Sequence, residues 1–321
     1  MQPTRRWFVR GLALLPLGAA VASAEKRLVF TVPDEATRLA AAGALDHLPA
    51  KLRAAFSPGP GDLPVPAPDP SDWLAQHPDE GQTYAQFLRM RQHKPTESRR
   101  TIAVKPLGQL AASAPLATIM DFAARYFMLP VTRRLTTPIA ALKATQREHG
   151  GRTQYLTESL IDALIPMLPP DAFCMIAVTM EDLYPHEDWN YVFGQARFHD
   201  GVGVYSFVRY DPKFHGEPHG PGTDKLILRR CLKLMVHEIG HMFAIRHCIY
   251  YECAMNGSNH LEETDRSPLH LCPVCLRKLH DSIGFDVEAR ERKLAEFFRA
   301  HDLTPEAEHA ERRLARLVAA I

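Results

Sequence analysis

Apolar and polar residues alternate along the middle of the chain with two different periods. Runs with a period of two, rich in β-branched and aromatic residues, predict strands, and runs with a helical period predict amphipathic helices. These runs follow one another as strand 101–107, helix 117–128, extended segment 131–139, helix 157–168, strand 172–180 and two strand-like runs at 190–198 and 202–210. Strands that alternate with helices predict an α/β domain built around a mixed sheet.

A long apolar helix is predicted after a Gly- and Pro-rich loop at 215–224, with Asp224 as its N-cap. The helix runs into VHEIGHMFAIRHCIYYECAM, residues 236–255, which contains three histidines and two cysteines. A helix that only fills a core would not carry histidines at these positions, and an exposed loop would be less apolar. This stretch is therefore the predicted functional region.

The residues before the α/β pattern predict an N-terminal extension. Residues 25–100 contain a proline-rich connector, which favours extended backbone, and a polar helix at 82–92. Nothing in this part indicates a chemistry, and it is interpreted as a prosegment-like cover over the main domain at 101–300. A helical tail is predicted at 301–321.

Residues 1–24 have the layout of a cleavable export signal. Arg5, Arg6 and Arg10 precede an apolar run that ends in small residues, and the paired arginines resemble a twin-arginine signal. The apolar run is shorter than the roughly 20 residues that a membrane-spanning helix needs. We expect export to a bacterial periplasm with no stable membrane anchor after signal removal; an amphipathic leader, a retained anchor and a cytoplasmic location are the alternatives.

The composition of the chain indicates a globular protein with a hydrophobic core. The chain has 321 residues, of which 46% are hydrophobic, enough for one large or two modest domains. The formal net charge is +1, and it becomes −2 when the three arginines of residues 1–24 are removed. This near-neutral balance gives no indication of a nucleic-acid partner.

Three histidines in the functional region have the spacing of metal ligands. His237 and His241 lie four residues apart on one helix face, and Glu238 beside them can hold a metal-bound water without binding the metal itself. The HExxH pattern alone is a weak indicator, since it also occurs on solvated helix faces. His247, past the expected helix end, could supply a third imidazole, and three ligands leave the fourth position that a catalytic zinc keeps open.

Four of the six cysteines, Cys248, Cys253, Cys272 and Cys275, fall within 28 residues. Disulfides are one interpretation in an exported protein. The closing Cys-Pro-Val-Cys pair suits a metal ion better than a disulfide. Cys174 and Cys231 lie in apolar segments and are interpreted as unreactive core thiols.

Together, HEIGHMFAIRHC, the following CIYYECAM and the later CPVC resemble the archaemetzincin family of zinc metallopeptidases, in the metzincin clan. The family pattern is HExxHxxGxxHC, a CxM and a later CxxC, and the metal-type residues here keep its order. The resemblance extends over about residues 100–285, with weaker similarity in DWLAQHP and QTYAQF. GSNHLEETDRSPLHLCPVCLRKLH and DLYPHEDWNYVFGQA look similar to the animal members.

The resemblance implies a fold and a set of ligands. The fold would be a metzincin-like zincin fold of the α/β (α+β) class, with a twisted mixed sheet over the active-site helix. His237, His241 and His247 would bind a catalytic zinc, with Glu238 as general base. A second, structural zinc would be bound by the four clustered cysteines, Cys248, Cys253, Cys272 and Cys275. Met255 would be the residue of the Met-turn, and each chain would bind two zinc ions.

One position departs from the family pattern. Ala244 stands where the family has the glycine at which the helix turns toward its third histidine. If this residue is left-handed, alanine costs about 1–2 kcal/mol more than glycine. We predict that the turn forms despite this strain, so that His247 points toward His237 and His241.

The expected function is hydrolysis of peptide bonds by zinc-activated water, with Glu238 as general base and a peptide or protein as substrate. Residues 190–198 and 202–210 are the candidate strands for pairing with an extended peptide. The alternatives are a zinc-stabilised peptide-binding protein without turnover and a latent enzyme whose cleft is covered by residues 25–100. The remaining histidines are expected at the surface, without partners at ligand spacing, among them His186, His215, His219, His260, His270 and His280.

Overall fold

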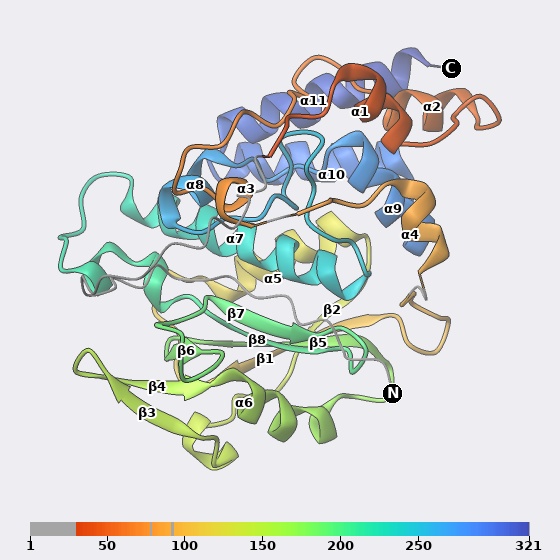
Figure 1. Ribbon diagram of the computed structural model, residues 1–321. Coiled ribbons are helices and arrows are strands. Elements are labelled where there is room, and N and C mark those ends of the chain that lie inside the picture. Colours follow the sequence, from red (N-terminus) through yellow and green to blue (C-terminus); the bar gives the residue numbers. More distant parts are fainter. Residues whose placement is uncertain (1–29, 78, 91–92, 321) are drawn as a thin grey trace.

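A mixed five-stranded sheet lies at the centre of the computed structural model, which describes residues 30–77, 79–90 and 93–320 (Figure 1). Its strand order is β2-β1-β5-β8-β7, and a smaller sheet has the order β3-β4-β6. The strands are β1 (Thr101–Leu107), β2 (Val131–Arg133), β3 (Gln146–His149), β4 (Arg152–Leu156), β5 (Ala172–Thr179), β6 (Asp182–Tyr184), β7 (Gly194–Arg197) and β8 (Val202–Ser206). The predicted export signal at 1–24 lies outside the described residues.

The central strand β5 is buried on both faces. Ile176 and Val178 pack into the core on one side of the sheet, whereas Met175 and Ala177 pack into the core on the other side. A continuous apolar run is typical of a parallel strand covered on both faces. β2, β1, β5 and β8 are parallel neighbours. β7 runs antiparallel to β8, which makes the sheet mixed as predicted.

Helices cover both faces of the sheet. In Figure 1, α5 (Leu116–Phe127) and α7 (Thr223–Met242) lie above it and α6 (Thr157–Leu164) lies below it. Helices α10 (Val287–Ala300) and α11 (Thr304–Ala319) pack on each other, and α10 also packs on α5. The other helical segments after residue 100 are α8 (Leu261–Arg266), α9 (Pro273–Ile283) and the 3₁₀ turns Ile139–Leu142, Ile165–Met167, Val208–Tyr210 and Pro212–His215.

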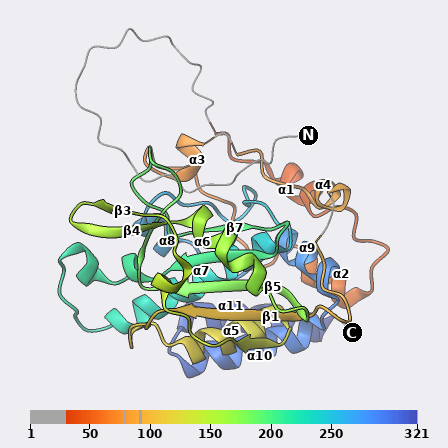
Figure 2. The ribbon, with the colours of Figure 1, turned by 90° about the horizontal axis from the view of Figure 1, so that it is seen from below.

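The N-terminal segment shares the core of the rest of the chain. Its helices are α1 (Glu35–Ala41), α2 (Ala50–Phe56), α3 (Trp73–Gln76) and α4 (Tyr84–Arg89). α2 packs on α9 and α11, and α4 packs on α9. Phe56, Trp73 and Phe87 are buried in the same cluster as α7. Seen from below, α1, α3 and α4 lie on the side of the molecule opposite to α5 and α10 (Figure 2). The segment is therefore built into the fold, because each short helix carries too few apolar residues for a core of its own.

Two local expectations were wrong. Asp224 is not the N-cap of α7: Gly222, with φ +84°, holds that position, and Asp224 lies in the first turn, where its charge still favours the helix dipole. The candidate strand 202–210 cannot pair with a peptide, because β8 is already hydrogen-bonded to β5 on one side and to β7 on the other. No helix in the described part of the chain has the length and apolar character that a bilayer span requires.

Candidate zinc sites

The structure brings His237, His241 and His247 together. One nitrogen from each ring lies within 4.8 Å of one nitrogen from the others. The ring centroids are 4.6 Å apart for His237 and His241, 5.3 Å for His237 and His247 and 5.1 Å for His241 and His247. The first two rings come from the last turns of α7, and the third comes from the segment that reverses after the helix.

The reversal occurs at Ala244, which has φ +61°. The Ala244 N–H donates to the His241 carbonyl (2.9 Å) and the Ile245 N–H donates to the Gly240 carbonyl (3.3 Å). This pair of bonds is a Schellman motif, in which the left-handed position is usually glycine. The prediction that the turn tolerates alanine, with His247 directed at the other two histidines, is confirmed.

The hydrogen bonds of the three rings assign their tautomers. Each Nδ1 faces an atom that can only accept: the Ala254 carbonyl for His237 (2.9 Å), the Ile245 carbonyl for His241 (2.7 Å) and an Asp79 carboxylate oxygen for His247 (2.9 Å). Nδ1 is therefore protonated in each ring, and Nε2 carries the lone pair.

The geometry of the Nε2 atoms fits a zinc ion. The Nε2 atoms of His237 and His241 are 3.1 Å apart, and two lone pairs at this distance repel unless a cation lies between them. A tetrahedral zinc, with nitrogen ligands at about 2.1 Å, places them about 3.4 Å apart. Burial lowers the pKa of His237 well below its usual value and that of His241 to about 3, so both rings are neutral, as metal binding requires.

Glu238, which follows His237 on α7, is a buried carboxyl group. Glu238 is only 9% exposed, and its carboxyl group has no hydrogen-bond partner among the described residues. Burial raises the pKa of Glu238 to about 8. Without a cation nearby, this carboxyl group exchanges a proton close to neutral pH, which is the range that suits a general base.

Met255 packs on the helix turn that carries the ligands. Its side chain is fully buried, and a methyl group added to Gly240 would overlap its thioether. The Met255 carbonyl accepts a hydrogen bond from the Cys248 N–H (2.8 Å). The position of the Met255 side chain therefore depends on Gly240, a residue that the sequence analysis did not assign. A glycine inside a helix, which costs stability, is the signal that could have identified it.

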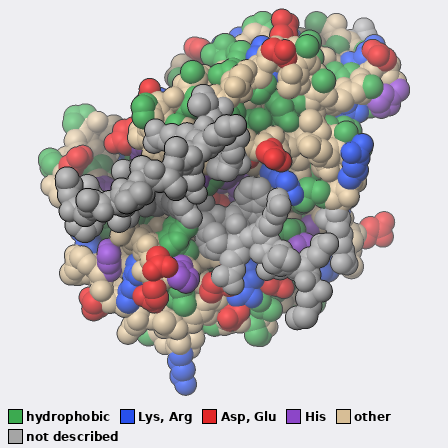
Figure 3. Space-filling model, in the orientation of Figure 1, with side chains coloured by type: hydrophobic (Ala, Val, Ile, Leu, Met, Phe, Trp, Pro, Cys, Tyr) green, Lys and Arg blue, Asp and Glu red, His purple; other side chains and the backbone are tan. Residues whose placement is uncertain are grey.

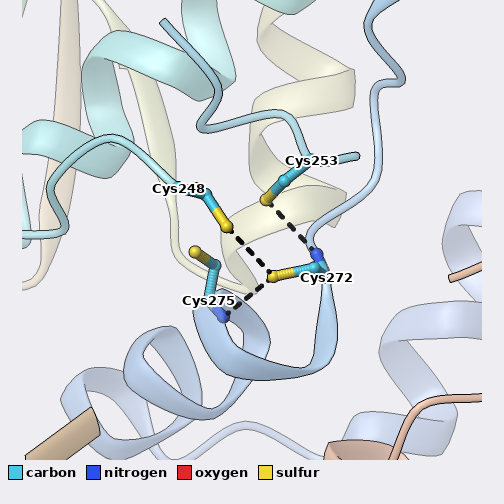
Figure 4. Close-up of side chains that lie close together, drawn as sticks. All are labelled: Cys248, Cys253, Cys272 and Cys275. Carbon is cyan, nitrogen blue, oxygen red and sulfur yellow. Dashed lines mark hydrogen bonds between the residues drawn. The ribbon is translucent and has the colours of Figure 1, made fainter. Parts of the chain in front are cut away.

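The four clustered cysteines converge on one point. Cys248 and Cys253 come from the loop after α7, and Cys272 and Cys275 come from the start of α9; their side chains point toward one another in Figure 4. All four sulfur atoms lie within 4.8 Å of one another and are buried. The Cys272 and Cys275 N–H groups donate to the sulfurs of Cys253 (3.3 Å) and Cys272 (3.5 Å).

The sulfur geometry fits a metal ion and not disulfides. The Sγ atoms of Cys248 and Cys272 are 3.6 Å apart, compared with about 2.05 Å in a disulfide. A tetrahedral zinc with sulfur ligands at about 2.3 Å places them about 3.8 Å apart. Burial, together with the neighbouring thiol of Cys248, holds the pKa of Cys272 well above its usual value, so a bound cation is needed to keep all four sulfurs as thiolates.

The two other cysteines do not join a site. Cys174 on β5 and Cys231 on α7 are both fully buried, and burial raises the pKa of each thiol. Both therefore stay protonated and fill space in the core, as the sequence analysis predicted.

The expectation that the remaining histidines lie at the surface, without partners at ligand spacing, holds for only some of them. His186, His215 and His219 are exposed. His260 lies near Asp72 and Glu263, and His270 stacks on His309 with ring centroids 3.4 Å apart. The contacts of His260 with Asp72 and of His270 with His309 join distant parts of the chain, so local spacing could not reveal them.

Neither of these additional groups fits a cation. The His270 and His309 pair adjoins Asp62, whose carboxylate accepts a hydrogen bond from Arg313 (2.9 Å) and also faces Arg316 (3.8 Å). In the other group, the Asp72 carboxylate accepts a hydrogen bond from Arg266 (2.6 Å). Arginine already supplies the positive charge in both places.

Comparison with known proteins identifies the family. The model of peptidase family M54 matches residues 128–281. Archaemetzincin-2 of Macaca fascicularis is 35% identical over 276 residues, and the human protein of the same name is 35% identical over 278 residues; each alignment covers 76% of both chains. A crystal structure of archaemetzincin from Methanopyrus kandleri is 27% identical, covers 60% of this chain and 99% of that one, and has a TM-score of 0.46.

These relationships favour a peptidase over the alternative of a zinc-stabilised binding protein without turnover. A peptidase acts on peptides or proteins, which agrees with the expected substrate class. The chain belongs to the archaemetzincin family, peptidase family M54, and is a zinc metallopeptidase.

Proposed function

We propose that His237, His241 and His247 hold the catalytic zinc through their Nε2 atoms and that Glu238 is the general base. The observation that carries this proposal is the set of Nδ1 hydrogen bonds, which leave a lone pair on each Nε2 atom, in three rings whose ligand nitrogens lie within 4.8 Å of one another. Glu238, the buried residue that follows His237 on the helix, supplies the carboxyl group. When bound, zinc would supply a Lewis acid that lowers the pKa of a water molecule and polarises a carbonyl group.

The residues of the chain account for the proton transfers. Glu238 would accept the proton of the attacking water and deliver it to the leaving amine, since its buried carboxyl group binds a proton more readily than an exposed one. The three neutral imidazoles add no negative charge to the site, so they preserve the full positive charge of the ion.

The edge strand β7 is the proposed place for the substrate backbone. β7 ends the five-stranded sheet, and within the described part of the chain no other strand pairs with its outer edge. An extended peptide added there would be held by main-chain hydrogen bonds, with little dependence on side-chain identity. Figure 3 shows acidic and basic side chains interspersed over the coloured part of this face of the molecule.

A second zinc, bound by Cys248, Cys253, Cys272 and Cys275, has a structural role in this proposal. Four thiolates complete a tetrahedron and leave no position for substrate. Because His247 and Cys248 are adjacent, this ion would also hold the segment that presents the third histidine. The proposal is two zinc ions per chain, in a protein exported with the aid of residues 1–24.

Glu238→Gln tests the catalytic assignment. The variant keeps the size of the side chain but cannot accept a proton, so we expect cleavage of a peptide library to fall by at least about 100-fold with zinc content unchanged. Glu252→Gln, which changes another glutamate of the same region, is the matched control and should cleave at the wild-type rate. Wild-type cleavage by Glu238→Gln would refute the role of this residue.

A further inference from the structure

We propose that Asp79 is a positioning residue for the third zinc ligand. It belongs to a strap, defined here as residues 73–77 and 79–82, that crosses the His247 segment. The proposal rests on the histidine zinc site proposed above. It assigns a function to the N-terminal segment that nothing in its own sequence pattern indicated.

The Asp79 carboxylate is fixed from three directions. Its side chain is 6% exposed, and one oxygen accepts hydrogen bonds from the His247 Nδ1–H (2.9 Å) and the Trp73 Nε1–H (3.1 Å). The other oxygen accepts from the Gly81 N–H (3.2 Å). A carboxylate held in this way can align an imidazole and increase its basicity toward a metal.

His247 differs from the other two ligands in this respect. His237 and His241 donate to carbonyl groups of segments that follow α7 directly, whereas His247 donates to a charged group 168 residues away in sequence. The Trp73 ring also packs edge-on against the His247 ring, with centroids 4.9 Å apart and planes at 84°. The strap therefore determines both the tilt and the tautomer of this one ligand.

Gln82 holds the backbone of the same segment. Its side-chain amide donates to the Ala244 carbonyl (3.2 Å), and its amide oxygen accepts from the Arg246 N–H (3.2 Å). Gln82 is 1% exposed, and its own carbonyl accepts a hydrogen bond from Lys278. These bonds bracket Ile245 and support the left-handed conformation at Ala244, where the family pattern has glycine.

The test compares Asp79→Ala and Asp79→Asn with Glu80→Gln, which changes the exposed neighbouring carboxylate. In each full-length protein, the zinc dissociation constant of the histidine site is measured by competition with a chromophoric chelator. The visible spectrum is recorded after cobalt(II) replaces zinc. We expect Asp79→Ala to raise the dissociation constant about 10- to 100-fold and to shift the cobalt bands. Asp79→Asn, which keeps an acceptor oxygen but no charge, should give a smaller rise, and Glu80→Gln should match wild type.

A wild-type dissociation constant and cobalt spectrum in folded Asp79→Ala would overturn the proposal. Equal weakening of the cysteine site would also overturn it, because it would mean general loss of structure. If Asp79→Ala does not fold, the same two measurements on Asp79→Asn decide. Failure of the proposed function is distinguishable, since it would appear as cleavage by Glu238→Gln or as undiminished zinc content in His237→Ala.

Discussion

At the scale of single residues, the site depends on a strained alanine and on a buried carboxyl group. Ala244 adopts φ +61° to close the helix and direct His247 back to the other ligands. Glu238, which follows His237 in the sequence, is buried, and burial raises its pKa to about 8. The left-handed conformation of Ala244 costs stability, and the burial of Glu238 changes its acidity. Both residues are close in sequence to the proposed ligands, and backbone strain of this kind is common at functional sites.

Ala244→Gly should stabilise the protein. Glycine removes the left-handed penalty of about 1–2 kcal/mol but loses about 0.5–1 kcal/mol through the greater freedom of the unfolded chain. The free energy of unfolding should therefore rise by about 0.5–1 kcal/mol, measured by denaturant titration of the zinc-loaded protein. Ala289→Gly, inside helix α10, is the control and should lower the free energy of unfolding. A loss of stability in Ala244→Gly would mean that the turn is not strained.

At the scale of elements, α7 packs against the segment that follows it through the contact between Gly240 and Met255. Gly240 lets the Met255 thioether lie against the helix between the turns of His237 and His241. The Met255 carbonyl in turn accepts a hydrogen bond from the Cys248 N–H, so the packing of α7 on Met255 is connected to the loop that carries Cys248 and Cys253.

Gly240→Ala should disrupt the packing of Met255 on α7 and destabilise the protein. The added methyl group would overlap Met255, and overpacking of this kind costs about 1–3 kcal/mol although alanine is the better helix former. Thermal unfolding checks this, with Gly220→Ala as the control, because no atom lies near the position of a methyl group there. Equal melting temperatures for the two variants would contradict the packing described for Met255.

The packing of α11 predicts a pH dependence of stability. Burial and the neighbouring Arg313 lower the pKa of His309, on α11, to about 2, compared with about 6.5 in an unfolded chain. Below pH 6.5 the unfolded state binds a proton that the folded state does not, so stability falls as the pH falls.

His309→Gln should remove this contribution. Between pH 6.5 and 5.5, the wild type should lose about 1 kcal/mol more stability than the variant. Denaturant titrations at the two pH values measure the difference, and His149→Gln, at an exposed position, is the control. Parallel pH profiles for wild type and His309→Gln would show that His309 does not carry the effect.

Elements with a clear hydrophobic period, and metal-type residues at the spacing of one helix or turn, could be predicted from the sequence. The strand at 172–180 and the pairs His237–His241 and Cys272–Cys275 lie at spacings that one strand or one helix imposes. The complete ligand sets span several elements and were expected only from the resemblance to the archaemetzincin family. Asp79 and Gln82 could not be predicted, because their partners lie more than 160 residues away and single polar residues carry no periodic signal. The packing of the N-terminal helices into the shared core could not be predicted either, because each helix contributes only one or two buried residues to it.

At the scale of the whole molecule, the two candidate sites connect segments that are otherwise far apart. The histidine site joins α7 to the strap of the N-terminal segment, and the cysteine site joins the loop after α7 to α9. If each site binds zinc as proposed, its ligands come together only in the folded chain, and the binding energy of the ion adds to the folding energy.

Removal of zinc should therefore destabilise the protein in two steps. A weak chelator should remove the ion of the three neutral histidines first, abolishing cleavage with a small fall in melting temperature. A strong chelator should then remove the ion of the four thiolates, with a much larger fall, because this ion holds the segments around α9 together. Calorimetry with zinc analysis at each step measures both. A single step, with both ions leaving together, would contradict the division into catalytic and structural sites.

Anomalous X-ray diffraction at the zinc absorption edge tests the central claim most directly. The account predicts two peaks per chain, one about 2.1 Å from the Nε2 atoms of His237, His241 and His247 and one about 2.3 Å from the four cysteine sulfurs. A disulfide among the four cysteines, or a chain with no peak between the three histidines, would contradict it.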